Sequence, residues 1–208
     1  MSFELWIAFT LATSALLVIP GPTVMLVVSY ALGHGRSSGW ATVPGVTLGD
    51  FTAMTVSLLG AGAIIAASAT LFTVLKLCGA AYLIWLGIQL WRANPALAEL
   101  KQAGNTSNNR RMFWNAYIVT ALNPKSIVFF IAFVPQFVDP TTPVFAQFAI
   151  METTFLALAA TNVAVWAVLA GQMRAQFRKP ALLRLANRTG AGFLIAAGLL
   201  TAAMRRTG

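Results

Sequence analysis

A Pro-Gly-Pro sequence interrupts the first apolar run of this chain. Pro20, Gly21 and Pro22 lie inside a run that extends from Leu5 to about Leu32. Proline has no N–H and its ring clashes with the preceding turn, so two prolines here predict a broken helix. At bilayer depth, backbone groups freed by a break are tolerated only where protein or a water-filled cavity covers them. Broken membrane helices of this kind are typical of transporters, which place half-helix ends at a central binding site.

A later apolar run contains a second interruption. Asn123, Pro124 and Lys125 lie in that run, and Pro124 follows the second proline of the first break by 102 residues. The same offset separates Asp50 from Glu152, each of which is an acidic residue inside an apolar run. Two breaks and two acids that share one offset predict an internal repeat of two halves.

The composition excludes a soluble protein. Of the 208 residues, 58% are hydrophobic and only 9% are charged, whereas a soluble domain has about 25% charged residues. The formal net charge is +9, but the basic residues lie between apolar runs, which favours a membrane face over nucleic acid. One cysteine and one histidine cannot form a zinc or iron site. We therefore expect neither an enzyme nor a cofactor or metal.

The apolar runs are long enough for six membrane spans at about 20 residues each. We expect an all-α integral membrane protein of six transmembrane helices, arranged as two inverted three-helix repeats with helices 1 and 4 broken. The whole chain, 1–208, forms one transmembrane transporter domain. Its parts are repeat one at about 1–92, a cytoplasmic linker at about 93–111 and repeat two at about 112–208. The spans are expected at about 5–32, 40–66, 71–91, 112–137, 144–170 and 190–204.

The distribution of basic residues predicts the orientation. Ten of the 14 lysines and arginines lie in the connections that follow spans one, three and five. Cytoplasmic connections are rich in these residues, so these connections are expected in the cytoplasm and both termini outside it. Each half has an odd number of spans, so the two halves are expected to be inverted.

Four ionisable side chains lie inside the spans, and each is a functional candidate because buried charge is costly in a bilayer. Asp50 and Lys76 are on adjacent antiparallel spans at similar depth, at about 1.5 Å of rise per residue, and form a possible ion pair. That pair is either a structural salt bridge or a gate. Glu152 has no evident partner in the sequence, which makes it the candidate for proton coupling; the alternative is a carboxyl group hydrogen-bonded to Thr or Asn. Lys125 lies centrally in its span.

The two breaks together suit a small zwitterion. The cation of Lys125 and the N–H groups of a half-helix start match a carboxylate, while freed carbonyls and carboxylates match an ammonium group. The alternative is that Lys125 only neutralises an acid. The residues expected to bind or translocate substrate are Pro20, Gly21, Pro22, Thr23, Asp50, Asn123, Pro124 and Lys125.

Four motifs in order resemble the LysE/RhtB family of amino-acid exporters, the lysine-exporter and homoserine/threonine-resistance type. They are the Pro-Gly-Pro of span one, GVTLGD at 45–50, LCGAAYLIWLG at 77–87 and LNPK at 122–125. The resemblance covers nearly the whole chain. It implies export of amino acids or their derivatives across the bacterial inner membrane, driven by the proton gradient. The resemblance implies that the functional motif residues of the family correspond here to Pro20, Gly21, Pro22, Gly45, Gly49, Asp50, Asn123, Pro124 and Lys125.

Two other readings stay open at this point. An inorganic cation exporter of related architecture would need clustered carboxylates or thiols, and only Asp50 and Glu152 are available for that role. A non-transporting assembly subunit would tolerate loss of Asp50 and Lys125. The expected partners are an amino-acid substrate and the lipid bilayer, and a homodimer is compatible with the sequence. No motif fixes the oligomeric state or the particular amino acid.

Overall fold

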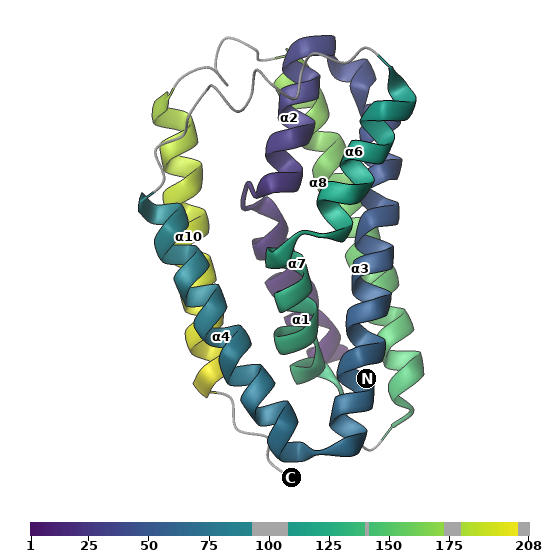
Figure 1. Ribbon diagram of the computed structural model, residues 1–208, viewed down its shortest axis with the longest axis vertical. Helices are drawn as coiled ribbons and strands as arrows, with labels where there is room; N and C mark the ends of the chain where they lie inside the picture. The colour runs from purple at the N-terminus through teal and green to yellow at the C-terminus, as the bar shows by residue number, and fades with distance from the viewer. Residues whose placement is uncertain (93–107, 140–141, 173–179, 204–208) are drawn as a thin grey trace.

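The computed structural model describes residues 1–92, 108–139, 142–172 and 180–203, and within these ranges the chain is helical with no strand (Figure 1). The predicted linker at about 93–111 lies mostly outside the described residues. The helices are α1 Phe3–Val18, α2 Pro22–His34, α3 Gly39–Ala67, α4 Ala69–Arg92, α6 Asn109–Ala121, α7 Pro124–Val128, α8 Val144–Gln172 and α10 Pro180–Ala203. A 3₁₀ turn, η1 (Arg36–Ser38), precedes α3, and a π-helical turn, η2 (Phe129–Phe133), and a 3₁₀ turn, η3 (Val134–Phe137), continue α7.

The membrane character of the chain is evident from its helices. Among the described residues, three helical stretches are long and apolar enough to cross a bilayer: Arg36–Ala63, Asn109–Phe137 and Val144–Gln172. The pair formed by α1 and α2 makes a fourth if the two count as one bent span. The apolar parts of α4 and α10 are shorter, at Thr73–Gln89 and Arg188–Ala203. The all-helical membrane class is therefore confirmed, whereas six inverted spans remain a prediction.

The first predicted break lies where the prolines placed it. Helix α1 ends at Val18, α2 begins at Pro22, and the two axes differ in direction by 50°. Pro22 occupies the first turn of α2, where a missing N–H costs nothing because that N–H would have no intrahelical partner. Gly21 caps α2 without a side-chain hydrogen bond, so the first N–H groups of α2 keep their capacity to bind another acceptor.

The second break also agrees with the sequence. Helix α6 ends at Ala121 and α7 begins at Pro124. The Asn123 side chain accepts a hydrogen bond of 3.1 Å from the Lys125 N–H and so caps α7, as asparagine commonly does at a helix start. The last helix differs from the prediction, because α10 begins at Pro180, about ten residues before the expected start of span six. Proline is favoured at the first position of a helix, where its missing N–H has no intrahelical partner to lose.

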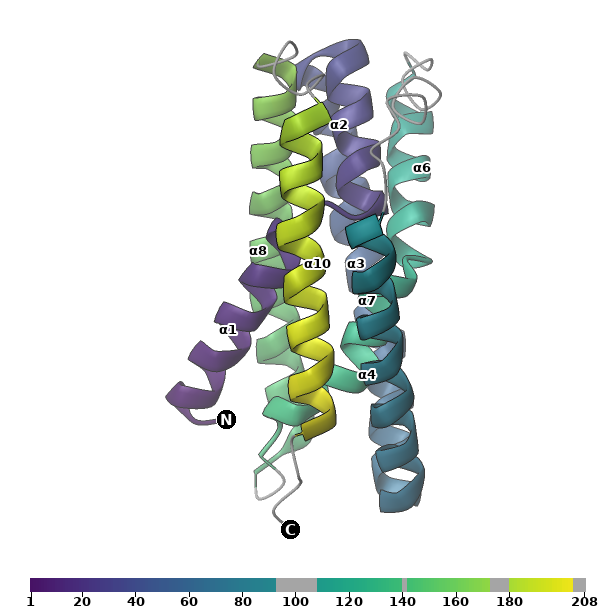
Figure 2. The same cartoon turned by 90° about the vertical axis from the view of Figure 1, so that its left-hand side faces the viewer.

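The helices form two groups. Helix α3 packs against α6 and α8, and α2 packs against α8. Helix α4 packs along α10; α4 contacts the first group through α3, α7 and η2, and α10 contacts α1. Figure 2 shows α1 tilted away from the bundle below the first break. Small residues bring α3 and α6 close together: a Cβ at Gly49 would lie 2.7 Å from the Tyr117 carbonyl oxygen, and one at Gly45 would meet the Phe113 carbonyl.

The two ends of the bundle differ in their charge. The turn with Arg36 and the start of α6, with exposed Arg110 and Arg111, lie at the end where α2 finishes (Figure 1). Helix α1 begins and α10 finishes toward the opposite end. This arrangement is the one that the positive-inside argument requires, although the sidedness itself remains a prediction.

Candidate functional site

The two helix breaks meet at one small cavity near the middle of the bundle. Its volume is about 30 Å³, room for little more than one water molecule. The lining residues come from the α1–α2 break, α3, the α6–α7 break and α8: Leu16, Leu17, Ile19, Gly21, Thr23, Val24, Val46, Asp50, Asn123, Lys125, Ser126, Ala159, Asn162 and Val163. Five of the predicted site residues thus share the cavity wall, while Pro20, Pro22 and Pro124 shape the breaks beside them.

Lys125 joins one break to the other. Its Nζ donates hydrogen bonds to the carbonyl oxygens of Leu16 at 3.4 Å and Ile19 at 3.2 Å, where α1 ends. The Leu16 carbonyl also accepts a hydrogen bond from the Ile19 N–H. A Cβ at Gly21 would lie 3.2 Å from the same Nζ, so glycine lets the ammonium group approach the backbone closely. The carbonyl groups that a break exposes at bilayer depth are therefore covered by a side chain from the other break.

Asp50 shares the cavity with Lys125, and its pairing with Lys76 stays a prediction. It is 4% exposed in the middle of α3, and the charge that acts on it is Lys125, itself 8% exposed. The sequence pointed to Lys76 because the two residues lie at similar depth on adjacent antiparallel spans. In the structure, α3 packs more extensively against α6 and α8 than against α4, and Lys76 of α4 is not part of the cavity wall. The buried acid of α3 and the buried base of the second break therefore line the same cavity.

Thr23 and Asn123 add a direct polar link between the breaks. The Thr23 hydroxyl oxygen accepts hydrogen bonds from the Thr120 hydroxyl at 3.2 Å and from Asn123 Nδ2 at 3.3 Å. The oxygen of the same Asn123 amide caps α7. One amide therefore connects the first turn of α2 to the first turn of α7, and any separation of the two breaks must break this bond.

Two lining residues, Asn162 and Ser126, were not among the predicted site residues. Asn162 Nδ2, from α8, donates a 2.9 Å hydrogen bond to the Leu17 carbonyl oxygen, so it covers another carbonyl group that the first break frees. Its sequence signal was an amide in the apolar run of α8. Ser126 follows Lys125 and had no distinguishing signal.

Removal of the Asn162 amide is expected to destabilise the first break. Asn162→Leu leaves the Leu17 carbonyl without its buried donor, and an unsatisfied buried polar group costs about 1–3 kcal/mol. The unfolding temperature of purified protein in detergent should fall. Thr161→Ala is the matched control, because the Thr161 hydroxyl bonds only the Ala157 carbonyl of its own helix and is exposed; an equal loss in both variants would contradict the capping role.

Glu152 lies outside this cavity. It is partly buried on α8, and its Oε1 accepts a hydrogen bond from the Thr55 hydroxyl of α3. This contact is the alternative that the sequence argument left open for Glu152. The bond connects two helices that both line the cavity, so a change in the charge of Glu152 acts on their packing.

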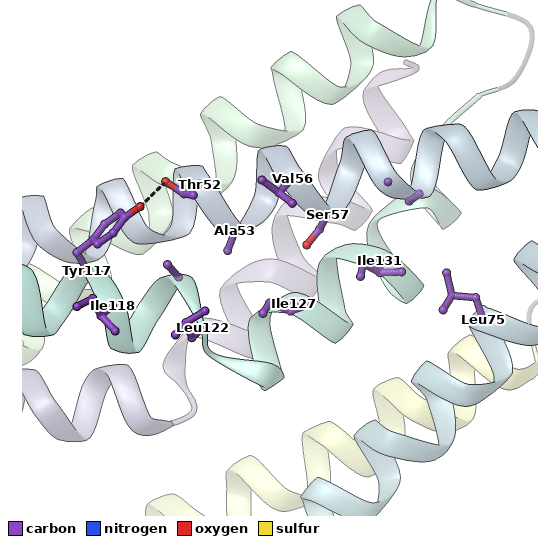
Figure 3. A pocket seen from close by; sticks show the side chains of 13 residues that line it. Thr52, Ala53, Val56, Ser57, Leu75, Tyr117, Ile118, Leu122, Ile127 and Ile131 are labelled. Carbon is purple, nitrogen blue, oxygen red and sulfur yellow. Dashed lines mark hydrogen bonds between the residues drawn. The ribbon is translucent and has the colours of Figure 1, made fainter.

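A larger, mostly apolar pocket lies on the other side of the second break (Figure 3). It has a volume of about 600 Å³ and is lined by residues of α3, α6 and the helix after the break, with Leu75 of α4. The hydroxyl groups of Thr52 and Tyr117 lie 3.5 Å apart at its wall. Ala121 and Leu122 line this pocket while Asn123 and Lys125 line the small cavity, so the α6–α7 break separates the two spaces.

The described residues hold no group of three or more His, Cys, Asp or Glu side chains that could bind a metal ion. The central features are instead two broken apolar helices, freed backbone groups and one buried acid–base pair. Such an arrangement defines a membrane transport protein. The chain belongs to the LysE family: the model described as LysE type translocator matches residues 14–205.

Named relatives agree with this assignment. A homoserine/homoserine lactone efflux protein of Salmonella typhimurium strain LT2 is 34% identical over 98% of both chains. A membrane protein of uncharacterised role from Vibrio cholerae is 31% identical over 97% of this chain and 98% of its own. A leucine efflux protein of Enterobacter sp. strain 638 is 29% identical over 67% of this chain and 66% of its own. No solved structure matches the chain. The predicted family is confirmed, and the protein is a translocator rather than an enzyme.

Proposed function

We propose that this protein is a secondary transporter that exports amino acids or their close derivatives across the bacterial inner membrane. The observation that carries the proposal is the cavity in which both helix breaks meet beside the buried pair of Asp50 and Lys125. Relatives named for efflux of homoserine, homoserine lactone and leucine support an amino-acid substrate. An inorganic cation exporter, the alternative reading, has less support because the described residues form no cluster of acidic or thiol ligands.

The cavity offers complementary groups to both charges of an amino acid. The Lys125 ammonium and the uncapped start of α2 at Gly21 match a carboxylate. The Asp50 carboxylate and the carbonyls of Leu16 and Ile19 match an ammonium group. In the structure the Lys125 ammonium bonds the Leu16 and Ile19 carbonyls and acts electrostatically on Asp50, so binding exchanges these internal contacts for contacts with substrate. Because of that exchange, the free energy of opening the cavity depends on whether substrate is bound.

The structure represents a closed conformation in this proposal, because a cavity of about 30 Å³ cannot hold an amino acid. Toward the end with Arg36, the apolar cluster of Val27, Val46 and Val163 and the hydrogen bond of 2.7 Å from Asn115 to the Tyr30 hydroxyl close the bundle. Toward the other end lies a larger apolar cluster that contains Phe9, Phe129, Phe130, Phe133 and Phe155. We infer alternating access through these two closures.

The offset of 102 residues and the charge at the bundle ends support six spans as two inverted repeats of about 1–92 and 112–208. In this topology the end with Arg36, Arg110 and Arg111 faces the cytoplasm and both termini face outside. A tail reporter that is active only in the cytoplasm is expected to be silent when fused after Gly208. Activity of that fusion would contradict the orientation.

Uptake into inverted membrane vesicles tests the function. Vesicles that contain the protein should accumulate radiolabelled homoserine or leucine when a proton gradient is imposed, and control vesicles without the protein should not. Accumulation of a divalent cation without any amino acid would favour the cation exporter instead. No accumulation of any amino acid in a full panel would contradict the proposal.

Glu152 is the proposed proton-coupling group, since it is the other intramembrane carboxylate and bonds Thr55 between two cavity-lining helices. Glu152→Gln keeps a hydrogen-bond acceptor but cannot change its charge. We expect this variant to move substrate down its concentration gradient while the proton gradient no longer drives accumulation. Thr55→Val removes only the donor and serves as the control for the hydrogen bond. Unchanged gradient dependence in Glu152→Gln would remove Glu152 from this role.

A further inference from the structure

A groove runs along the outside of the bundle between the first turns of α3 and the last turns of α8. Its volume is about 830 Å³. Trp40, Val43 and Pro44 of α3 form one wall, and Ala164 and Val168 of α8 form the other. The groove is separate from both the central cavity and the apolar pocket of Figure 3, with which it shares no residue.

One end of the groove is cationic. Arg36, in the turn before α3, lines that end and is exposed. Among the residues that the structure describes, its guanidinium group has no acidic partner. The described acids lie elsewhere: Glu4 begins α1, Asp139 follows η3, and Asp50 and Glu152 are inside the bundle.

An exposed tryptophan indicates where the cationic end of the groove lies relative to the bilayer. Trp40 lies one turn into the helical stretch that starts at Arg36, and it is 87% exposed. Tryptophan is enriched where the hydrocarbon of a bilayer meets the headgroups. An exposed arginine one turn farther out is then at the level of lipid phosphates.

We propose that this groove binds one anionic phospholipid, with the headgroup phosphate at the Arg36 guanidinium and an acyl chain against Trp40, Pro44 and Val168. Arginine pairs with phosphate through two parallel N–H donors, and the groove below it is apolar. Anionic lipid is attracted to the basic end of a membrane protein. The pocket of Figure 3 is apolar but has no cation in its wall, so it lacks a ligand for a headgroup. The proposal depends on the membrane location of the chain and not on its substrate.

Native mass spectrometry of the full chain, released from detergent at increasing lipid concentration, tests this site. Phosphatidylglycerol should occupy one saturable site about fivefold more tightly than phosphatidylcholine with the same acyl chains, as expected for one cation near the surface. Inorganic phosphate at millimolar concentration should not displace the lipid. Arg36→Gln should lower phosphatidylglycerol binding to the level of phosphatidylcholine. Arg110→Gln, which removes an exposed cation at the same end but outside the groove, should leave binding unchanged.

A second variant tests the apolar wall of the groove while the Arg36 charge is kept. Val168→Trp fills the apolar wall from an exposed position on α8 and should weaken both lipids while Arg36 is intact. Equal binding of the two lipids by the unaltered protein would overturn the proposal. So would equal losses in Arg36→Gln and Arg110→Gln, displacement by inorganic phosphate, or unchanged binding in Val168→Trp.

Discussion

Replacement of Lys125 by methionine is expected to abolish export and to destabilise the folded bundle by about 1–3 kcal/mol, the cost of leaving a buried polar group without its partner. The variant removes the buried cation that acts on Asp50 and the ammonium donor to the Ile19 carbonyl, while the Leu16 carbonyl keeps its bond from the Ile19 N–H. Vesicle uptake measures the first effect, and thermal unfolding in detergent measures the second.

A double variant distinguishes binding from stability. Asp50→Asn combined with Lys125→Met removes both charges, so stability should recover in part while export stays absent, because neither charge of the substrate is then matched. The coupling between the two single changes should be of the order of 1 kcal/mol or more, as is found for residues that interact directly.

Lys76→Met is the informative comparison. Lys76 is also a buried lysine in an apolar helix, but it lies outside the cavity wall, so export and the interaction between Asp50 and Lys125 should persist. Normal export by Lys125→Met, or coupling of Asp50→Asn with Lys76→Met in place of Lys125→Met, would contradict the assigned pair.

Gly49→Ala is expected to lower export at least tenfold, although it adds only one methyl group. The new Cβ would lie 2.7 Å from the Tyr117 carbonyl oxygen and 2.8 Å from Thr120 Cβ, closer than side-chain carbons normally approach. Backbone cannot move aside as a flexible side chain can, so α3 and α6 must separate. The cost of such overpacking is about 1–3 kcal/mol. Since Gly49 precedes Asp50 and Thr120 donates to Thr23, the separation displaces both sides of the cavity.

Gly60→Ala is the matched control on the same helix. A Cβ at Gly60 would meet nothing within 4 Å, since this residue lines the larger pocket. The control should keep both export and unfolding temperature, or gain slightly in stability because alanine favours helix over glycine. Equal effects of the two substitutions on export would show that close packing of α3 on α6 does not position the site.

The helix breaks were predictable because proline acts locally. Pro22 and Pro124 each start a helix, and the two breaks were found at the expected residues. Pro44 lies inside α3 without ending it. The predicted start of the last helix was too late because Pro180 was assigned to a polar connection. In the structure Pro180 is the first residue of α10.

The shared cavity of Asp50 and Lys125 was not predictable from the chain alone. Helix depth places Lys125 centrally and Lys76 less deep, and the packing of α3 on α6 brings Lys125 to the cavity that Asp50 lines. Asn162 illustrates the same limit, because its hydrogen bond joins α8 to a carbonyl 145 residues earlier. Contacts of this kind depend on tertiary arrangement, which neither hydropathy nor proline positions specify.

The central claim is that substrate binds where the two breaks meet, and a cysteine protection measurement tests it most directly. The chain has one cysteine, Cys78, which is exposed and can be replaced by serine. Ser126→Cys in that background places a nearly isosteric thiol in the cavity wall, and Ser57→Cys places one in the larger pocket. The site predicts that homoserine or leucine slows alkylation of the thiol at position 126 and not of the thiol at position 57. Protection at position 57 alone, or equal labelling of both thiols with and without a substrate that the vesicles export, would contradict it.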